Sequence, residues 1–287
     1  MAGIMLYQEK KVNSILNPTG GFLKSFTHSL NPYGGCAFGA PTTNGEGCPF
    51  CYVRELPVAK YARARWGEWV TAKINGDEAL RQQLKKLADN GELSRLRIFM
   101  GTSTDSYQGI ERRLQLTRRI LEVFTDFSAI GVLVVQTRSP MIERDVDLLQ
   151  ALGKKVWVSF TLETDDDQVR RLITPTSPSV ERRLRTLEKL TRSGIQTQCA
   201  ISPRRPNNAE RFAELLKDRC TRALVDTFEG DGAGGKRTEK LGIPKLYKRL
   251  GYGSWLARDS YLPLLEALRR ALGEERVVFS QDGFNDV

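Results

Sequence analysis

The sequence of 287 residues contains one histidine and no apolar run long enough to span a bilayer. Its first residues also lack the continuous apolar region and the small-residue cleavage site of a secretory signal. We therefore expect a soluble, cytoplasmic protein without a membrane partner, whose thiols stay reduced. The shortage of histidine also disfavours a catalytic cysteine, because such a cysteine normally needs a histidine partner.

Cysteine is scarce as well, yet three of the five cysteines lie in one Gly- and Pro-rich stretch, NPYGGCAFGAPTTNGEGCPFCYVRE (31–55). In a reducing compartment, clustered cysteines bind metal or do chemistry more often than they form disulfides. Three thiolates leave one coordination position open on a metal or cluster. The stretch therefore indicates a metal centre, with three candidate ligands: Cys36, Cys48 and Cys51.

Two kinds of metal centre compete for these thiols. A structural zinc ion needs a fourth protein ligand, and the single histidine, His28, alternates with Phe26 and Leu30 in a predicted strand. We therefore expect His28 in the core or the wall of the fold. An iron-sulfur cluster with three thiolates and one open iron fits the ligand count better.

The charge is strongly basic, with 44 Lys and Arg against 34 Asp and Glu and a formal net charge of +10. Such a chain can bind nucleic acid or another polyanion. The densest basic run, 234–255, mixes tyrosine and tryptophan with Lys245, Lys248 and Arg249. It predicts either a phosphate-contacting segment or an ordinary surface loop with a short helix.

Short apolar runs alternate with amphipathic stretches, which indicates a mostly parallel sheet covered by helices. We predict strands at 24–30, 96–101, 131–137, 155–162, 195–201 and 222–228. We predict helices at about 77–89, 108–125, 141–151, 177–193, 207–218 and 259–272. In a barrel or a doubly wound sheet of this kind, reactive groups gather beyond the carboxyl ends of the strands. The cysteine loop follows the first strand and obeys that rule.

Two motifs in this loop carry a family resemblance: Asn31-Pro32-Tyr33-Gly34-Gly35-Cys36 and Cys48-Pro49-Phe50-Cys51-Tyr52. With these motifs the chain resembles the radical S-adenosylmethionine (SAM) superfamily, and within it the proteins similar to spore photoproduct lyase. The segments 100–124, 132–149 and 158–195 look like the same branch, so the resemblance covers roughly 24–230. It implies an α/β fold, a partial (β/α)6 TIM-like barrel with the cluster loop after the first strand.

The predicted organisation is an N-terminal extension (1–23), the barrel (24–230) and a C-terminal loop, helix and short strand (231–287) that pack on it. One departure from the family lies between Cys36 and Cys48, where eleven residues, AFGAPTTNGEG, stand in place of the usual three. We expect this insertion to loop out and return Cys48 to the cluster. A zinc site built on Cys48 and Cys51, with Cys36 idle, is the alternative.

The resemblance implies a 4Fe-4S cluster on these three cysteines, SAM bound to the open iron, and a reducing electron donor such as a flavodoxin or ferredoxin. Reductive cleavage of SAM then yields a 5'-deoxyadenosyl radical that abstracts hydrogen from a substrate. Strand alternation nominates residues that contact SAM. They are Arg138 with Gln136 for the carboxylate, Thr102, Ser103 and Thr104 for the amino group, Ser159, Thr161 and Glu163 for the ribose and the amino group, and Phe50 for adenine.

The substrate is less defined by the sequence. Spore photoproduct lyase carries a further cysteine near the segment that matches TSTD (102–105), and this chain has none there. Cys199 and Tyr107 are the candidate catalytic radical relays in its place. We favour a nucleic acid or nucleotide substrate; a peptide or a small metabolite is the alternative, and so is a non-catalytic nucleic-acid-binding module with a structural zinc ion or cluster.

Overall fold

The computed structural model describes residues 5–43, 45–230 and 233–287. Its main sheet has eight strands in the order β11-β10-β9-β8-β7-β6-β3-β2. They are β2 (Leu16–Pro18), β3 (His28–Leu30), β6 (Arg97–Met100), β7 (Val132–Thr137), β8 (Val156–Thr161), β9 (Gln196–Ile201), β10 (Arg222–Val225) and β11 (Val277–Phe279). The predicted boundary at residue 231 lies outside the described residues.

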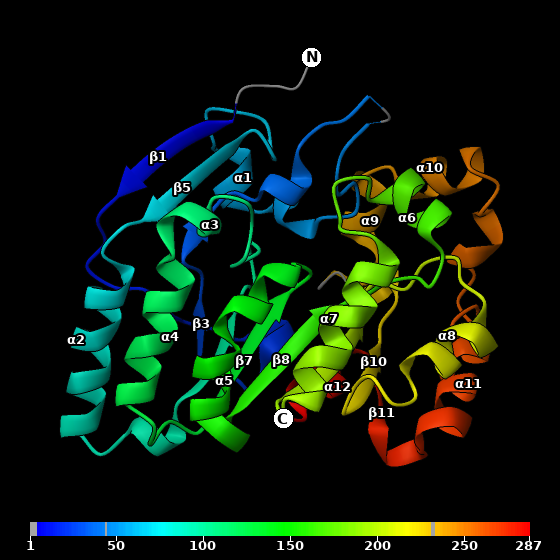
Figure 1. The fold of residues 1–287 in the computed structure, drawn as a ribbon. Coiled ribbons are helices and arrows are strands. Elements are labelled where there is room, and N and C mark those ends of the chain that lie inside the picture. The colour runs from blue at the N-terminus through cyan, green and yellow to red at the C-terminus, as the bar shows by residue number, and fades with distance from the viewer. Residues whose placement is uncertain (1–4, 44, 231–232) are drawn as a thin grey trace.

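All six predicted strands are confirmed, as β3 and β6 to β10, and each pairs in parallel with its neighbour. The first strand is shorter than predicted, because 24–27 form a turn after the 3-10 segment Gly21–Leu23. At one edge β11 adds a further parallel strand, and at the other β2 pairs antiparallel with β3. This parallel, helix-covered sheet is the partial TIM-like barrel that the sequence predicts (Figure 1).

Helices cover the outer face of this sheet (Figure 1). They are α2 (Gly76–Asp89), α4 (Leu116–Asp126), α5 (Val146–Leu152), α7 (Val180–Arg192), α8 (Ala209–Leu216) and α11 (Leu262–Leu272). The prediction of one continuous helix at 108–125 was wrong. Gln115 takes a left-handed conformation (φ 50°) and separates α3 (Glu111–Leu114) from α4. The predicted helix at 141–151 begins instead with a 3-10 segment, Pro140–Asp145.

Shorter helices escaped the sequence prediction because each is too short to show an amphipathic period. They are α1 (Pro57–Lys60), α6 (Asp167–Ile173) and α12 (Ser280–Asn285). The short helices α9 (Lys236–Lys240) and α10 (Ile243–Arg249) lie in the run 234–255, where a short helix was one of the two predictions. No helix in the part of the chain that the structure describes is long and apolar enough to cross a membrane.

The barrel wall separates two apolar cores through strand alternation. On β7, Leu133 and Val135 join the large core beneath the helices, whereas Val132 and Val134 join a smaller core inside the barrel. The inner core also contains Phe99 of β6 and closes the amino-terminal end of the barrel. The cysteine loop lies at the other end of the barrel.

A second sheet, which the sequence analysis missed, fixes the chain just before Cys36. It contains β1 (Leu6–Lys10), β5 (Trp69–Lys73) and β4 (Tyr33–Gly34), in the order β1-β5-β4. Gly35 follows with φ +74°, and a Cβ atom there would lie 2.2 Å from the backbone oxygen of Trp69. Only glycine permits this close approach, so the glycine before Cys36 sets the start of the loop.

The C-terminal residues close the open side of the barrel. Helix α12 contacts the 3-10 segment at 21–23, and the Phe284 ring lies edge-on to Phe22, with the ring centroids 5.4 Å apart. The Asn285 side chain donates to the Phe22 carbonyl at 2.8 Å and accepts from the Ser25 backbone N–H at 2.8 Å. The two terminal parts of the chain thus seal the gap between β11 and β2.

Candidate functional site

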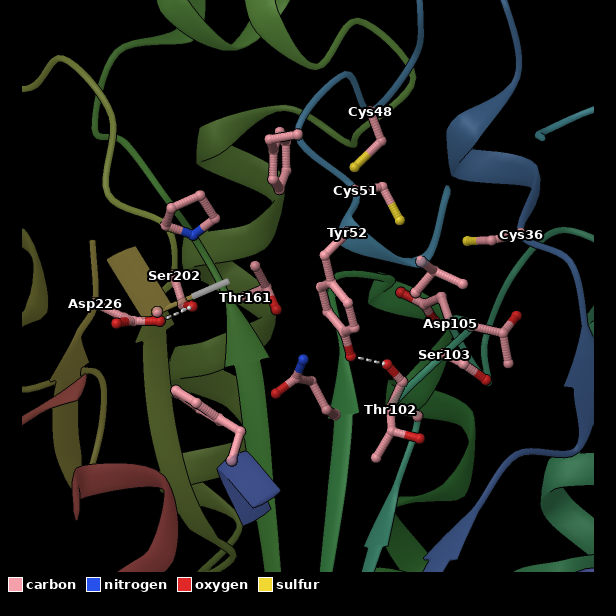
Figure 2. A pocket seen from close by; sticks show the side chains of 18 of the residues that line it. Cys36, Cys48, Cys51, Tyr52, Thr102, Ser103, Asp105, Thr161, Ser202 and Asp226 are labelled. Atoms are coloured by element: carbon pink, nitrogen blue, oxygen red, sulfur yellow. Dashed lines mark hydrogen bonds between the residues drawn. The ribbon is translucent and has the colours of Figure 1, made fainter. Parts of the chain in front are cut away.

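A cavity of about 450 Å³ opens at the carboxyl ends of the parallel strands. It brings together most of the predicted site residues: Cys36, Cys48, Phe50, Cys51, Thr102, Ser103, Thr104, Gln136, Arg138 and Thr161. Figure 2 shows the three cysteines at one side of this cavity and Ser202 with Asp226 across from them. The long insertion therefore does not remove Cys36 from the neighbourhood of the other two cysteines.

Side chains from outside the loop hold it over the barrel. Gln108 accepts from the Ala37 backbone N–H at 2.8 Å and donates to the Gly35 carbonyl at 3.3 Å. Thr176, which follows α6, donates to the carbonyls of Phe38 and Gly47 at 2.6 and 3.0 Å. One hydroxyl thus ties the two ends of the insertion together, which explains how eleven residues fit between two cysteines of one site.

The three thiols differ in acidity. The pKa of Cys48 is lowered to about 7, because the Cys51 thiol donates to it and Arg138 and Arg205 stabilise its thiolate. The Arg138 Nη1 atom lies 4.0 Å from the Cys48 sulfur. Burial raises the pKa of Cys36 to about 11, and the hydrogen bond to Cys48 raises that of Cys51. A metal centre on these cysteines must therefore release protons from Cys36 and Cys51 as it forms.

Three arginines surround one carboxylate beside this loop. Glu163 is fully buried and pairs with Arg183 at 2.8 Å, Arg138 at 3.2 Å and Arg205 at 3.7 Å. Burial alone would raise the pKa of Glu163, but the three guanidinium groups outweigh burial and lower it to about 2. The four side chains carry a surplus of positive charge, of which Arg138 faces the cavity.

This surplus charge fits an anionic cofactor. Arg205 is fully buried, and the three nitrogens of its guanidinium have no hydrogen-bond partner among the described residues. Such a group is costly unless negative charge lies close by, and Glu163, 3.7 Å away, is shared with Arg138 and Arg183. Three thiolates around a cluster and the carboxylate of SAM would supply that charge on the cavity side. The donor set and the cationic wall therefore fit the cofactors that the sequence implies.

A zinc ion with three or more protein ligands gains no support from the geometry of the described residues. Within 5–43, 45–230 and 233–287, no three His, Cys, Asp or Glu side chains form a group that could hold one metal ion. A cluster distributes its thiolates over different irons and does not require them to converge on one point. Three thiolates at one side of the cavity match the ligand count of a cluster with one open iron.

Polar groups after β6 support the cavity floor. The Asn31 side chain donates to the Thr102 hydroxyl at 2.8 Å and accepts from the Ser103 backbone N–H at 3.0 Å. The Thr104 hydroxyl donates to the Gly35 carbonyl. The hydroxyls of Thr102 and Thr104 thus already have partners within the chain, and Ser103 presents the remaining side-chain hydroxyl of this predicted set.

Two residues assigned to SAM lie behind the cavity wall, which corrects the sequence prediction. Ser159 is fully buried, donates to Gln136 at 3.4 Å and accepts from Gln198 at 3.2 Å. Glu163 lies two residues beyond the end of β8, where the arginines enclose it. Thr161, between them in sequence, is the member of this alternating set that lines the cavity.

The aromatic prediction also changes. The Phe50 ring lines the cavity, but the Arg205 guanidinium lies 3.8 Å from its centroid, so one face of the ring is occupied. The two predicted relays, Cys199 and Tyr107, are fully buried in the core beneath the helices and are absent from the cavity lining. The structure therefore does not bring either relay candidate to the cysteines.

Sequence analysis missed several residues of the site. Asp105 is buried and accepts from the Thr137 hydroxyl at 2.6 Å and the Arg138 backbone N–H at 3.0 Å, which fixes the backbone of Arg138. The Tyr52 hydroxyl donates to the Thr102 carbonyl at 2.5 Å across the cavity mouth (Figure 2). The sequence feature that could have assigned Tyr52 to the site was its position next to Cys51. For Asp105 that feature was its position after a predicted strand.

Ser202 and Asp226 form the opposite wall. The Ser202 hydroxyl donates to the Asp226 carboxylate at 3.0 Å, and both residues follow strand ends, after β9 and β10. A Cβ atom on Gly230 would lie 2.2 Å from Asp226 Oδ1, so the chain passes directly over the carboxylate. This wall lies beyond the residues assigned to SAM and is available to a substrate.

The fold and the site together define an α/β barrel with a cavity at the carboxyl ends of its strands and three thiols in the loop after its first barrel strand. A model of the radical SAM superfamily matches residues 30–219. The chain belongs to this superfamily, whose members are enzymes.

Relatives in sequence include an uncharacterized protein of Methanocaldococcus jannaschii, 29% identical over 193 residues, which are 67% of this chain and 65% of that protein. Another is an uncharacterized protein of Mycobacterium bovis, 25% identical over 201 residues, which are 67% of this chain and 54% of that protein. The chain thus spans a little over half to about two thirds of the length of these relatives.

Solved structures of spore photoproduct lyase share the fold. One point mutant superimposes with a TM-score of 0.64 at 12% identity and covers 96% of this chain and 81% of that chain. A double mutant with bound AdoMet and dinucleoside spore photoproduct gives a TM-score of 0.60 at 14% identity, with the same coverage. At this identity the likeness establishes the fold alone.

Proposed function

We propose that this protein cleaves SAM reductively at a 4Fe-4S cluster held by Cys36, Cys48 and Cys51. When bound, these cofactors supply a 5'-deoxyadenosyl radical that abstracts a hydrogen atom from a substrate. The observation that supports this proposal most is the convergence of the three cysteines, a cationic wall and strand-end polar groups on one cavity. Membership of the radical SAM superfamily is consistent with it.

Different residues of the chain bind SAM and exclude water in this proposal. Arg138 faces the cavity from a backbone fixed by Asp105, and its guanidinium pairs with a SAM carboxylate in our assignment. Ser103, Gln136 and Thr161 present polar groups to the remainder of SAM. The aromatic closure of the inner core excludes water from below, which protects a reactive radical.

Ser202 and Asp226 lie across the cavity from the cysteines and contact the substrate in this proposal (Figure 2). Nucleic acid or nucleotide stays our favoured substrate class, because the charge of +10 fits a polyanion. A peptide or small-metabolite substrate is the competing assignment.

The decisive experiment is anaerobic reconstitution with iron and sulfide, followed by dithionite reduction with SAM and chromatography for 5'-deoxyadenosine. We expect about four irons per chain in the reconstituted protein and formation of 5'-deoxyadenosine. Stable binding of one zinc ion, without 5'-deoxyadenosine, would contradict the proposal and favour the non-catalytic module.

A further inference from the structure

The positive charge of the chain is concentrated at the mouth of the cavity. Two segments border it: 54–65, which begins three residues after Cys51, and 236–249, which contains α9 and α10. Together they hold ten Lys and Arg residues against two Asp and Glu residues, in a chain whose whole net charge is +10. We call the surface of these two segments the basic mouth.

The two segments form one continuous surface. Helix α9 contacts the 3-10 segment Tyr52–Glu55, and α9 also contacts α10. A hydrogen bond from Lys60 lowers the pKa of Glu55, and Lys240 of α9 adds to this effect, so charges of both segments act on one carboxylate. Figure 1 places α1, α9 and α10 at the same end of the barrel.

Apolar side chains are exposed within this charged surface. Tyr61 is 86% exposed and Val58 46%, and both lie in the segment 54–65. Large apolar groups that remain in water and are rimmed by charge mark a surface that meets another protein. A phosphate backbone alone would give no reason for the exposed valine.

The basic mouth is also the exterior of the cysteine loop. Tyr52 directly follows Cys51, and the Arg54 guanidinium donates to the Pro49 carbonyl inside the loop at 3.2 Å. Any protein bound to 54–65 therefore lies against the backbone that carries Cys48 and Cys51. This placement suits delivery of an electron to a centre held by those cysteines.

We propose that the basic mouth docks the electron donor, an acidic protein that carries one electron on a flavin or an iron-sulfur centre. This inference rests on the proposed function, and its new content is the surface that binds the donor. The donor loses one electron and the centre held by the three cysteines gains it; no atom or proton is transferred. Charge complementarity gives rapid association and a complex that salt weakens.

The test uses full-length reconstituted protein and reduced flavodoxin as the acidic donor. Its readouts are the rate of cluster bleaching in a stopped-flow spectrometer and the yield of 5'-deoxyadenosine. The variant Arg63→Glu/Lys240→Glu reverses one exposed charge in each segment, and Lys85→Glu/Lys86→Glu on exposed α2 is the matched control. We expect the first variant to slow flavodoxin-driven bleaching at least about tenfold, and the control to change it less than about twofold.

Dithionite separates the two proposals, because a small reductant needs no docking surface. We expect both variants to form 5'-deoxyadenosine at the wild-type rate with dithionite. Failure of the wild-type protein to do so would overturn the proposed function and this inference with it. Equal flavodoxin rates in the mouth variant and the control would overturn the docking surface alone. The mouth variant could instead lose binding to a single-stranded oligonucleotide while its flavodoxin-driven rate stays at the wild-type value. That result would also overturn the docking surface and would assign the basic mouth to nucleic acid.

Discussion

Glu163 shows how one buried residue determines the electrostatics of the site. Its carboxylate is the centre on which Arg138, Arg183 and Arg205 converge, so it orients the guanidinium that faces the cavity. Removal of the carboxylate would leave three guanidinium groups, two of them fully buried, close together without this counter-ion. A residue that sequence alternation assigned to the cofactor thus acts through the arginine in front of it.

We expect Glu163→Gln to lower the free energy of unfolding by roughly 3 to 5 kcal/mol near neutral pH. The folded-state pKa of Glu163 is about 2, below its ordinary value of 4.5, so the unfolded state binds the proton more readily. The stabilisation is therefore complete above pH 4.5 and is lost as the pH falls toward 2.

Urea denaturation of both proteins checks this expectation. The difference between wild type and variant should shrink by roughly 2 kcal/mol between pH 4.5 and pH 3. Glu181→Gln is the control, because this side chain is 74% exposed and pairs with Arg185 on the helix surface; we expect a change below about 0.5 kcal/mol. A difference that did not vary with pH would show that Glu163 is not ionised in the folded protein.

The three loop cysteines should act as a unit, since each supplies one thiolate to the same centre in our assignment. We expect Cys36→Ala, Cys48→Ala and Cys51→Ala each to abolish SAM cleavage and to lower the iron content after reconstitution. Cys220→Ala is the control, because Cys220 is buried outside the cavity lining. Normal iron content in Cys36→Ala would show that Cys48 and Cys51 hold the metal without it.

Arg138→Ala should weaken SAM binding by about tenfold or more, because a charge-assisted pair at a partly dry site is lost. Iron content should stay at the wild-type level, since no thiolate is removed. Isothermal titration of the reconstituted protein measures the affinity, with Arg171→Ala, whose side chain is 62% exposed, as the control. Equal SAM affinities in all three proteins would remove Arg138 from the site.

At the scale of elements, the sequence predicts strands and helices with a periodic apolar pattern. It misses short elements and contacts between segments that are distant in the chain. The parallel strands followed from apolar runs, and the positions of Arg138 and Thr161 followed from alternation near strand ends. Contacts between distant segments, such as Arg205 on Phe50 or Gln108 on the cysteine loop, leave no periodic signal. Ten of the predicted residues line the cavity, as expected for groups near the carboxyl ends of parallel strands. The other predicted residues are buried by partners far along the chain and do not reach the cavity.

Helix α12 closes the barrel through the polar contacts of Asn285 and the apolar contacts of Phe284. Phe284 is 7% exposed, contacts Phe22 and Phe99, and forms part of the cavity wall. We expect Phe284→Ala to lower the free energy of unfolding by roughly 3 kcal/mol or more, because a cavity opens at the seam of the barrel. Asp282→Ala on the same helix, with its side chain 93% exposed, should change it by less than about 0.5 kcal/mol. Equal thermal midpoints for the two variants would contradict the closing role of α12.

At the scale of the whole molecule, the barrel separates the cysteines into two populations. Among the described residues, those that line the cavity are the three of the loop, whereas Cys199 and Cys220 are enclosed by the core. A radical formed on a substrate in this cavity therefore meets no further thiol. Tyr52 is the described tyrosine that lines the cavity, and burial raises its pKa to about 12, so it keeps its proton at neutral pH.

Because no further described thiol lines the cavity, we expect the reaction of this protein to differ from that of spore photoproduct lyase. A lyase that restores two thymines must return a hydrogen atom to the product radical, and a thiol is a good donor because its S–H bond is weak. We expect the reconstituted protein to cleave SAM without efficiently converting dinucleoside spore photoproduct to two thymines. Cys199→Ala and Tyr107→Phe should keep most SAM cleavage, because both side chains lie in the core, whereas Tyr52→Phe should change the fate of the substrate radical. Chromatography of SAM products and thymine products in one reaction distinguishes SAM cleavage from repair of the lesion. Clean repair by the wild-type protein that disappears in Cys199→Ala would contradict this expectation. It would mean that the fold opens far enough to bring this buried thiol to the cavity.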